Sequence, residues 1–171
     1  MQAEKLSGKI KIILDPRKAR SVSEKKKRYY AKYAFLVSET LKEPLFQKFL
    51  QKILKKEKVK MDEIRAIRIK TFPLKNKKGN SLAGKCRNNG VIYIYPKNIR
   101  FFQKLTQKWK KEKFKDFIMR RARAALIHEL LHIKYLEKEQ RVRKLTRKYF
   151  EMFIRLNPDA NKETRFTMLP K

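Results

Sequence analysis

The segment that most restricts the fold of this chain is LIHELLHIKYLEKEQ, residues 126–140, which contains both histidines of the sequence. His128 and His132 are four residues apart, so on an α-helix they lie on the same face and can direct nitrogen atoms at one point. Ala, Leu and Ile surround them in AALIHELLHI, which is typical of a buried helix. The segment therefore predicts a core helix with two imidazoles directed at one place.

Glu129 directly follows the first histidine and completes the pattern H-E-x-x-H. In this pattern the imidazoles bind zinc and the intervening carboxylate accepts a proton from water. Coincidence produces the arrangement in a chain of this composition about once in a thousand. We therefore predict Zn²⁺ as cofactor, His128 and His132 as ligands and Glu129 as catalytic base; the alternative interpretation is a hydrogen-bonded pair of core histidines.

A catalytic zinc site needs a third protein ligand and keeps its fourth position for water. No further histidine exists and no cysteine follows the motif, so the third ligand is expected to be a carboxylate. We favour Glu139, because a turn near residues 136–138 lets the next helix, beginning near Glu139, direct its first-turn carboxylate back at the metal. The other candidates are Glu137, Glu151, Asp159 and Glu163.

Hydrophobic periodicity predicts an α+β fold for the rest of the chain. The turn residues Asn88-Asn89-Gly90 predict a hairpin, and DEIRAIRIKTF predicts a strand with one basic face. The expected elements are strands at 9–14, within 62–72, at 81–87 and at 91–95, helices at 24–41 and from Pro44, and helices from Pro96 to Asn157. We predict an antiparallel sheet, a backing helix, the H-E-x-x-H helix and a following helix.

One domain accounts for this order. Its expected parts are a basic N-terminal arm, or a strand plus helix start, over residues 1–30, a catalytic domain over residues 31–156, and a tail over residues 157–171. The single cysteine, Cys86, excludes an intramolecular disulfide and favours the cytoplasm. We interpret Cys86 as a partly buried strand residue; its interpretation as a thiolate ligand of the zinc is the weaker alternative. No apolar run is long enough to predict a membrane span.

The charge of the chain is extreme, since 48 Lys and Arg against 16 Asp and Glu give +32. This favours attachment to nucleic acid over attachment to an anionic membrane, and the alternative is a solvated, lysine-rich surface. The runs EKKKRYYAKY and KWKKEKFK are the local candidates for nucleic-acid contact, but no individual binding residue is indicated. Trp109, Phe101 and Phe102 can stack bases, although their helical spacing favours core packing. The oligomeric state is not indicated.

The order helix, strand, hairpin and a helix carrying HELLH resembles the compact archaeal gluzincin-like metallopeptidases called minigluzincins. More distantly it resembles the SprT-like metalloproteases that act on DNA-bound proteins. The resemblance covers residues 35–153. It implies zinc-dependent cleavage of a protein or peptide, with His128 and His132 as ligands, Glu129 as base and an acidic ligand on the following helix. It also implies that a peptide pairs with GVIYIYPK or with SLAGKC, and that the tail, residues 157–171, lies in the cleft of a latent enzyme.

The sequence departs from the SprT-like pattern because IKYLEKEQ replaces a third histidine, which implies a Glu-completed site. Tyr93, Tyr95 and Tyr149 are candidate oxyanion donors or, more simply, core and sheet-surface aromatics.

The sequence supports two hypotheses about function. The first is a zinc metallopeptidase, which its basic surface would bring to nucleic-acid-bound or acidic substrates. The alternative is a nucleic-acid-binding protein with a structural or inactive zinc site.

Overall fold

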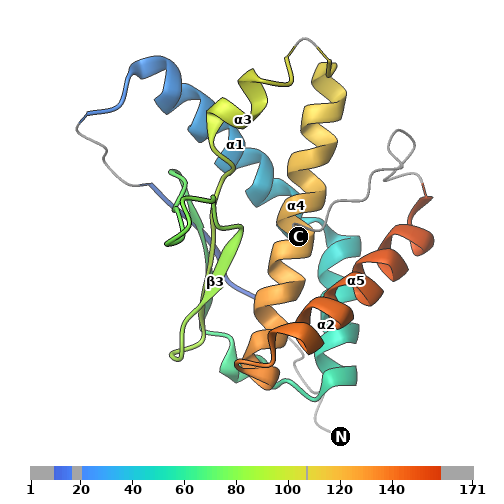
Figure 1. The fold of residues 1–171 in the computed structure, drawn as a ribbon. Helices are drawn as coiled ribbons and strands as arrows, with labels where there is room; N and C mark the ends of the chain where they lie inside the picture. The colour runs from blue at the N-terminus through green and yellow to red at the C-terminus, as the bar shows by residue number, and fades with distance from the viewer. Residues whose placement is uncertain (1–9, 17–20, 107, 159–171) are drawn as a thin grey trace, which may run out of the picture.

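The computed structural model describes residues 10–16, 21–106 and 108–158 (Figure 1). Residues 1–9, and residues 159–171 of the predicted tail, lie outside the described residues. The elements in chain order are β1 (Ile12–Asp15), α1 (Glu24–Lys42), α2 (Pro44–Glu57), a short 3₁₀ helix (Met61–Glu63), β2 (Ala66–Lys70), β3 (Gly84–Cys86), β4 (Val91–Ile94), α3 (Ile99–Gln103), α4 (Lys111–Tyr135) and α5 (Glu139–Leu156). The predicted α+β class is confirmed.

The four strands form one mixed sheet in the order β1-β2-β4-β3. β1 pairs with β2 and β2 with β4 in parallel, whereas β3 and β4 are antiparallel. The prediction of an antiparallel sheet is therefore wrong except for the hairpin. The physical reason is the connection between β1 and β2, which contains α1 and α2 and is long enough for a parallel crossover.

The predicted turn between β3 and β4 is confirmed. Gly90 has a φ of +75°, and a Cβ at this position would lie 2.1 Å from the carbonyl oxygen of Glu63. Only glycine combines this conformation with such a close approach of two backbones. The side-chain oxygen of Asn89 also accepts a hydrogen bond from the N–H of Val91. The turn places β4 inside the sheet and leaves β3 at its edge.

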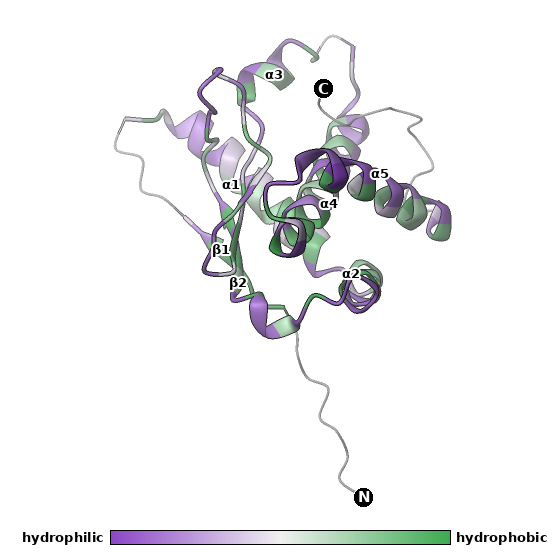
Figure 2. Ribbon diagram, turned by 60° about the horizontal axis from the view of Figure 1, so that its bottom comes forward, coloured by the Kyte–Doolittle hydropathy of each residue, from purple (hydrophilic) through white to green (hydrophobic). Residues whose placement is uncertain are grey.

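The core lies between one face of the sheet and the helices α1 and α4 (Figure 1). Ile67, Ile69, Ile92 and Ile94 point into it and are at most 1% exposed. In Figure 2 hydrophobic residues concentrate on β1, β2 and α4, whereas α2 and α5 each carry a hydrophobic and a hydrophilic side. Alternation along the strands turns the neighbouring residues of β2 and β4 to the opposite face of the sheet.

The helices begin and end close to the predicted positions. α1 begins at Glu24, α2 has Pro44 at its first position, and α5 begins at Glu139. The proposed boundary between residues 30 and 31 falls inside α1, while β1 belongs to the central sheet. Among the described helices, none has both the length and the apolar character that a membrane crossing needs.

Candidate metal centre

The H-E-x-x-H segment occupies the last two turns of α4, which packs against β3, β4 and α5. The helix ends at Tyr135, and the following Leu136 adopts a positive φ of 47°. This backbone conformation is unfavourable for a side chain with a Cβ, and it reverses the chain within residues 136–138. α5 therefore begins at Glu139 directly beside the end of α4, as the sequence predicts.

His128, His132 and Glu139 form a single group, with one ligand atom of each within 4.8 Å of the others. The Nε2 atoms of the two histidines are 3.1 Å apart. Oε2 of Glu139 lies 3.1 Å from Nε2 of His132, and its Oε1 lies 3.6 Å from Nε2 of His128. The predicted first choice for the third ligand is therefore the carboxylate that lies beside the histidines.

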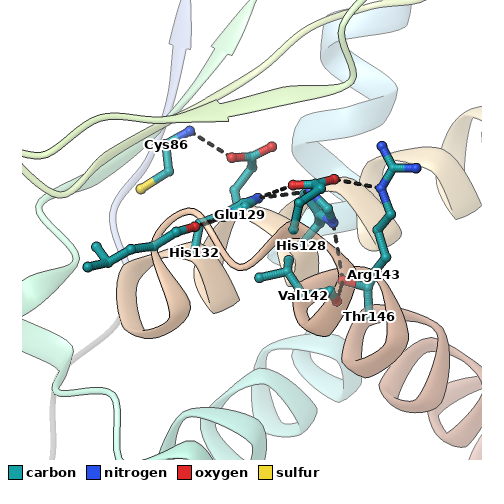
Figure 3. Close-up of polar contacts among 9 residues, drawn as sticks. Cys86, His128, Glu129, His132, Val142, Arg143 and Thr146 are labelled. Carbon is teal, nitrogen blue, oxygen red and sulfur yellow. Dashed lines mark hydrogen bonds and ion pairs between the residues drawn. The ribbon is translucent and has the colours of Figure 1, made fainter.

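The far side of each imidazole ring has its own hydrogen-bond partner (Figure 3). Nδ1 of His132 lies 2.6 Å from the carbonyl oxygen of Leu136, which can only accept, so this nitrogen carries the proton. Nδ1 of His128 lies 3.3 Å from Oγ1 of Thr146, whose own proton is donated to the carbonyl of Val142. Both Nδ1 atoms are therefore donors, and in the neutral rings both Nε2 atoms are lone-pair acceptors.

This donor set fits a divalent cation. Two Nε2 lone pairs and a carboxylate converge with no proton between them when the rings are neutral. Burial, with the neighbouring charges of His132 and Arg143, lowers the pKa of His128 to about 4 despite the opposing charge of Glu139, so its ring is neutral at pH 7. Tetrahedral zinc with Zn–N bonds of about 2.0–2.1 Å separates two ligand nitrogens by about 3.3 Å, close to the 3.1 Å seen here.

Arg143 orients the third carboxylate. Its Nε donates to Oε1 of Glu139 at 2.6 Å, one helical turn along α5. Burial favours the neutral acid, but the hydrogen bond and the charge of Arg143, together with the adjacent imidazoles, outweigh it, and the pKa of Glu139 is lowered. Glu139 is therefore ionised at neutral pH and available as an anionic ligand.

Glu129 points away from this group toward the edge strand, and its carboxylate accepts a hydrogen bond from the backbone N–H of Cys86 at 2.7 Å (Figure 3). The residue is 7% exposed. Burial, together with the charge of Glu139, raises its pKa to about 7, against the opposing effects of His132 and the Cys86 N–H. A carboxyl group with this pKa can both accept and return a proton near neutral pH.

The other candidates lie elsewhere. Glu137 is exposed in the turn, and Glu151 lies 3.9 Å from Arg155 in an exposed ion pair. Burial and the charge of Glu129 raise the pKa of Cys86 to about 11, and its thiol is not among the grouped ligand atoms of the described residues. The hydroxyl of Tyr149 is bound to Glu57. Asp159 and Glu163 lie outside the described residues.

Sequence reasoning missed Thr146, Arg143 and Gly84. A signal for Thr146 exists, because it is the polar member of the buried stripe Val142, Thr146, Tyr149 and Phe153 on α5. Gly84 also carries a signal, since an isolated glycine in a strand indicates a close approach of another group. A Cβ at Gly84 would lie 2.7 Å from Cγ of Glu129.

A scan against protein-family models, a search of curated proteins and a search of solved structures each gave no match.

Proposed function

We propose that this protein is a zinc-dependent metallopeptidase that cleaves an extended stretch of a protein or peptide. The observation that carries the proposal is the convergence of His128, His132 and Glu139, which present only acceptors to one point. A hydrogen-bonded core pair of histidines fits it less well, since with both Nδ1 atoms protonated such a pair needs an additional proton between the two Nε2 atoms.

His128, His132 and Glu139 would hold the zinc, which would supply Lewis acidity for activating water and polarising a substrate carbonyl. The chain supplies the remaining functions. Glu129, on the same helical turns and with its raised pKa, accepts the proton of the water and returns it to the leaving amine. Thr146 and the Leu136 carbonyl hold the two rings in the tautomer that leaves Nε2 unprotonated.

The edge strand β3 supports an extended substrate. The carbonyl of Ala83 accepts a hydrogen bond from the N–H of Tyr95, and the N–H of Arg87 donates to the carbonyl of Val91. By alternation, the backbone groups of Gly84 and the carbonyl of Cys86 point away from β4, toward the edge of the sheet, where the Cys86 N–H is bound to Glu129. A peptide that adds a strand here places its backbone next to Glu129. Of the two segments named by the resemblance, SLAGKC contains this edge and GVIYIYPK contains the interior strand β4.

The first experiment measures bound metal per chain by elemental mass spectrometry after purification without added metal. We expect close to one zinc in the wild type, and loss in His132→Ala and in Glu139→Ala. Glu151→Ala is the matched control, because it removes an exposed carboxylate from the same helix and retains the metal. Wild-type protein that stays metal-free after zinc is offered contradicts the proposal.

The second experiment compares cleavage of an unstructured protein by the wild type and by Glu129→Gln. The amide keeps the shape of the carboxylate but cannot accept the proton, so zinc is retained and cleavage falls by about 100-fold or more. Full cleavage by this variant contradicts the role of Glu129. Stoichiometric zinc with no cleavage of any tested protein favours the alternative function, a nucleic-acid-binding protein with a structural or inactive site.

A further inference from the structure

The face of the sheet that points away from α1 and α4 is basic and aromatic. Register across the four strands aligns Ile13, Arg68, Tyr93 and Lys85 in one row. The same alternation adds Lys70 beside Asp15 on β1 and β2, with Tyr95 and Arg87 immediately after β4 and β3. We call Arg68, Lys70, Lys85, Arg87, Tyr93 and Tyr95 the open sheet face.

Planar groups stack on this face. The rings of Tyr93 and Tyr95 are 6.4 Å apart between centroids and inclined by 25°. The guanidinium carbon of Arg87 and the ammonium nitrogen of Lys70 each lie 5.0 Å from the centroid of Tyr93. Nucleobases stack on tyrosine rings and on guanidinium planes. The open sheet face therefore offers surfaces of the type that unpaired bases use.

The charge of this face complements a phosphate backbone. Among the residues of the four strands, Asp15 is the one acid, and it is paired with Lys70 and lies 3.6 Å from Arg68. Lys85 and Arg87 are exposed, and the Arg68 side chain is 42% exposed. These three cations flank the two tyrosines on neighbouring strands, within reach of a chain that lies across the sheet.

Further basic residues gather at the carboxyl ends of the parallel strands. A hollow of about 300 Å³ lies there, lined in part by Phe72 after β2 and Asn98 after β4. Lys26, Lys75 and Arg100 also line it, and all three are exposed. No acidic residue is among the described residues that line this hollow.

The aromatic residues singled out in the sequence are engaged elsewhere. Phe101, Phe102 and Trp109 pack around Phe117 in one aromatic cluster. Tyr30 is buried, and its hydroxyl accepts a hydrogen bond from the N–H of Ile99. Base stacking at the runs EKKKRYYAKY and KWKKEKFK is therefore less favourable than on Tyr93 and Tyr95.

We propose that the open sheet face binds single-stranded nucleic acid, with bases stacked on Tyr93 and Tyr95 and phosphates held by Arg68, Lys85 and Arg87. Single strands are favoured over duplexes because the bases of a duplex are stacked on one another and present no free ring face. The binding goes beyond the proposed peptidase and does not rest on the metal site, since the face lies on the other side of the sheet from α4.

The test is fluorescence anisotropy with a labelled 12-nucleotide single strand, as DNA and as RNA, against a duplex of the same sequence at several salt concentrations. We expect tighter binding of the single strand. Tyr93→Ala with Tyr95→Ala lowers its affinity by at least about 10-fold, whereas the corresponding double change to Phe keeps the rings and the affinity.

A second experiment tests the role of charge by comparing two triple variants that lose the same number of positive charges. Arg68→Gln, Lys85→Gln and Arg87→Gln together reduce the slope of log K against log salt by about 2, because each lost phosphate contact contributes about 0.7 to the slope. Lys144→Gln, Arg147→Gln and Lys148→Gln on the exposed side of α5 leave affinity and slope nearly unchanged. Equal effects of both triples, equal binding of duplex, or an unchanged affinity in the Tyr-to-Ala variant each overturns the proposal. A fourth overturning result is tighter binding of an acidic peptide of matched charge than of the single strand.

Discussion

Gly84 shows how the absence of one side chain organises the candidate catalytic site. It lies in the edge strand opposite Glu129, and a Cβ there would come within 2.9 Å of a carboxylate oxygen of Glu129. The same carboxylate is held by the N–H of Cys86 at 2.7 Å. The position of the catalytic base in the proposed function thus depends on a contact that only glycine permits.

We expect Gly84→Ala to retain zinc but to lower cleavage of an unstructured protein by about 10- to 100-fold, because a displacement near 1 Å at a reacting group has an effect of this size. Steady-state cleavage rates and metal content are the measurements. The matched control is Gly79→Ala, where a Cβ meets nothing within 4 Å and a φ of +78° introduces only local strain. Equal loss of activity in both variants contradicts the positioning role.

At the residue scale, His128, Glu129 and His132 are predictable because a four-residue spacing acts within one helix. Thr146 is different. Its hydroxyl reaches His128 from another helix, and its partner is 18 positions away in the sequence. Local periodicity identifies Thr146 as a polar residue in an apolar stripe, but the packing of α4 against α5 determines which atom it contacts.

Three helices, α2, α4 and α5, meet at a buried carboxylate. Glu57, at the end of α2, is 7% exposed and accepts hydrogen bonds from Tyr135 of α4 and Tyr149 of α5. The ammonium group of Lys134 lies 3.5 Å from the same carboxylate. Burial raises the pKa of Glu57, but the two hydroxyls and Lys134 outweigh it, so its pKa is lowered. This cluster connects the two helices that carry the candidate metal ligands.

Glu57→Gln should lower the free energy of unfolding by about 1–3 kcal/mol at pH 7, because buried donors lose a charged acceptor. A lowered folded-state pKa means that the stabilisation is present above the unfolded pKa of about 4.3 and is lost as the pH falls through the folded pKa. Urea denaturation at pH 7 and in acid measures the free energy of unfolding of the wild type and of the variant. The difference between wild type and variant should shrink in acid.

Glu151→Gln is the control for this experiment. Its carboxylate is exposed and 3.9 Å from Arg155, so the expected change is within about 0.5 kcal/mol at either pH. A Glu57→Gln effect that is the same at both pH values would show that shape, and not the charge of the carboxylate, carries the stabilisation.

For the whole molecule, the sheet separates two surfaces with different chemistry. Its helix-covered face carries the buried isoleucines and borders the candidate metal centre. Its open face carries cations and tyrosines. The two proposals therefore place peptide cleavage and nucleic-acid binding on opposite sides of one sheet, and we expect variants of one surface to leave the other activity unchanged.

Metal removal should destabilise the whole fold, because the three candidate ligands join α4 to α5. At about 1,000 times its Kd, zinc contributes about 4 kcal/mol, which corresponds to a shift in Tm of roughly 8–16 °C for a domain of this size. Differential scanning calorimetry with and without a chelator measures the shift. His132→Ala, which lacks a ligand, should show no chelator effect; an equal shift in this variant contradicts the site.

The features that depend on neighbours within a few positions were predictable from the sequence. The helix carrying His128, Glu129 and His132, the reversal before Glu139 and the turn at Gly90 all follow from spacing, apolar periodicity and turn chemistry. These features were predictable because a helix or a turn satisfies its hydrogen bonds locally.

The features that join distant segments were not predictable in this way, because they arise from packing. Four features depend on how strands and helices pack: the parallel pairing of β1 with β2, the edge position of β3 against Glu129, the Thr146 hydroxyl beside His128 and the place of Tyr93 on the open sheet face. Strand order is not encoded in the alternation of any one strand, since the same alternating pattern pairs equally well with several neighbours. Burial of the isoleucine-rich face against α1 and α4 selects one arrangement, and that arrangement positions the rest of the site.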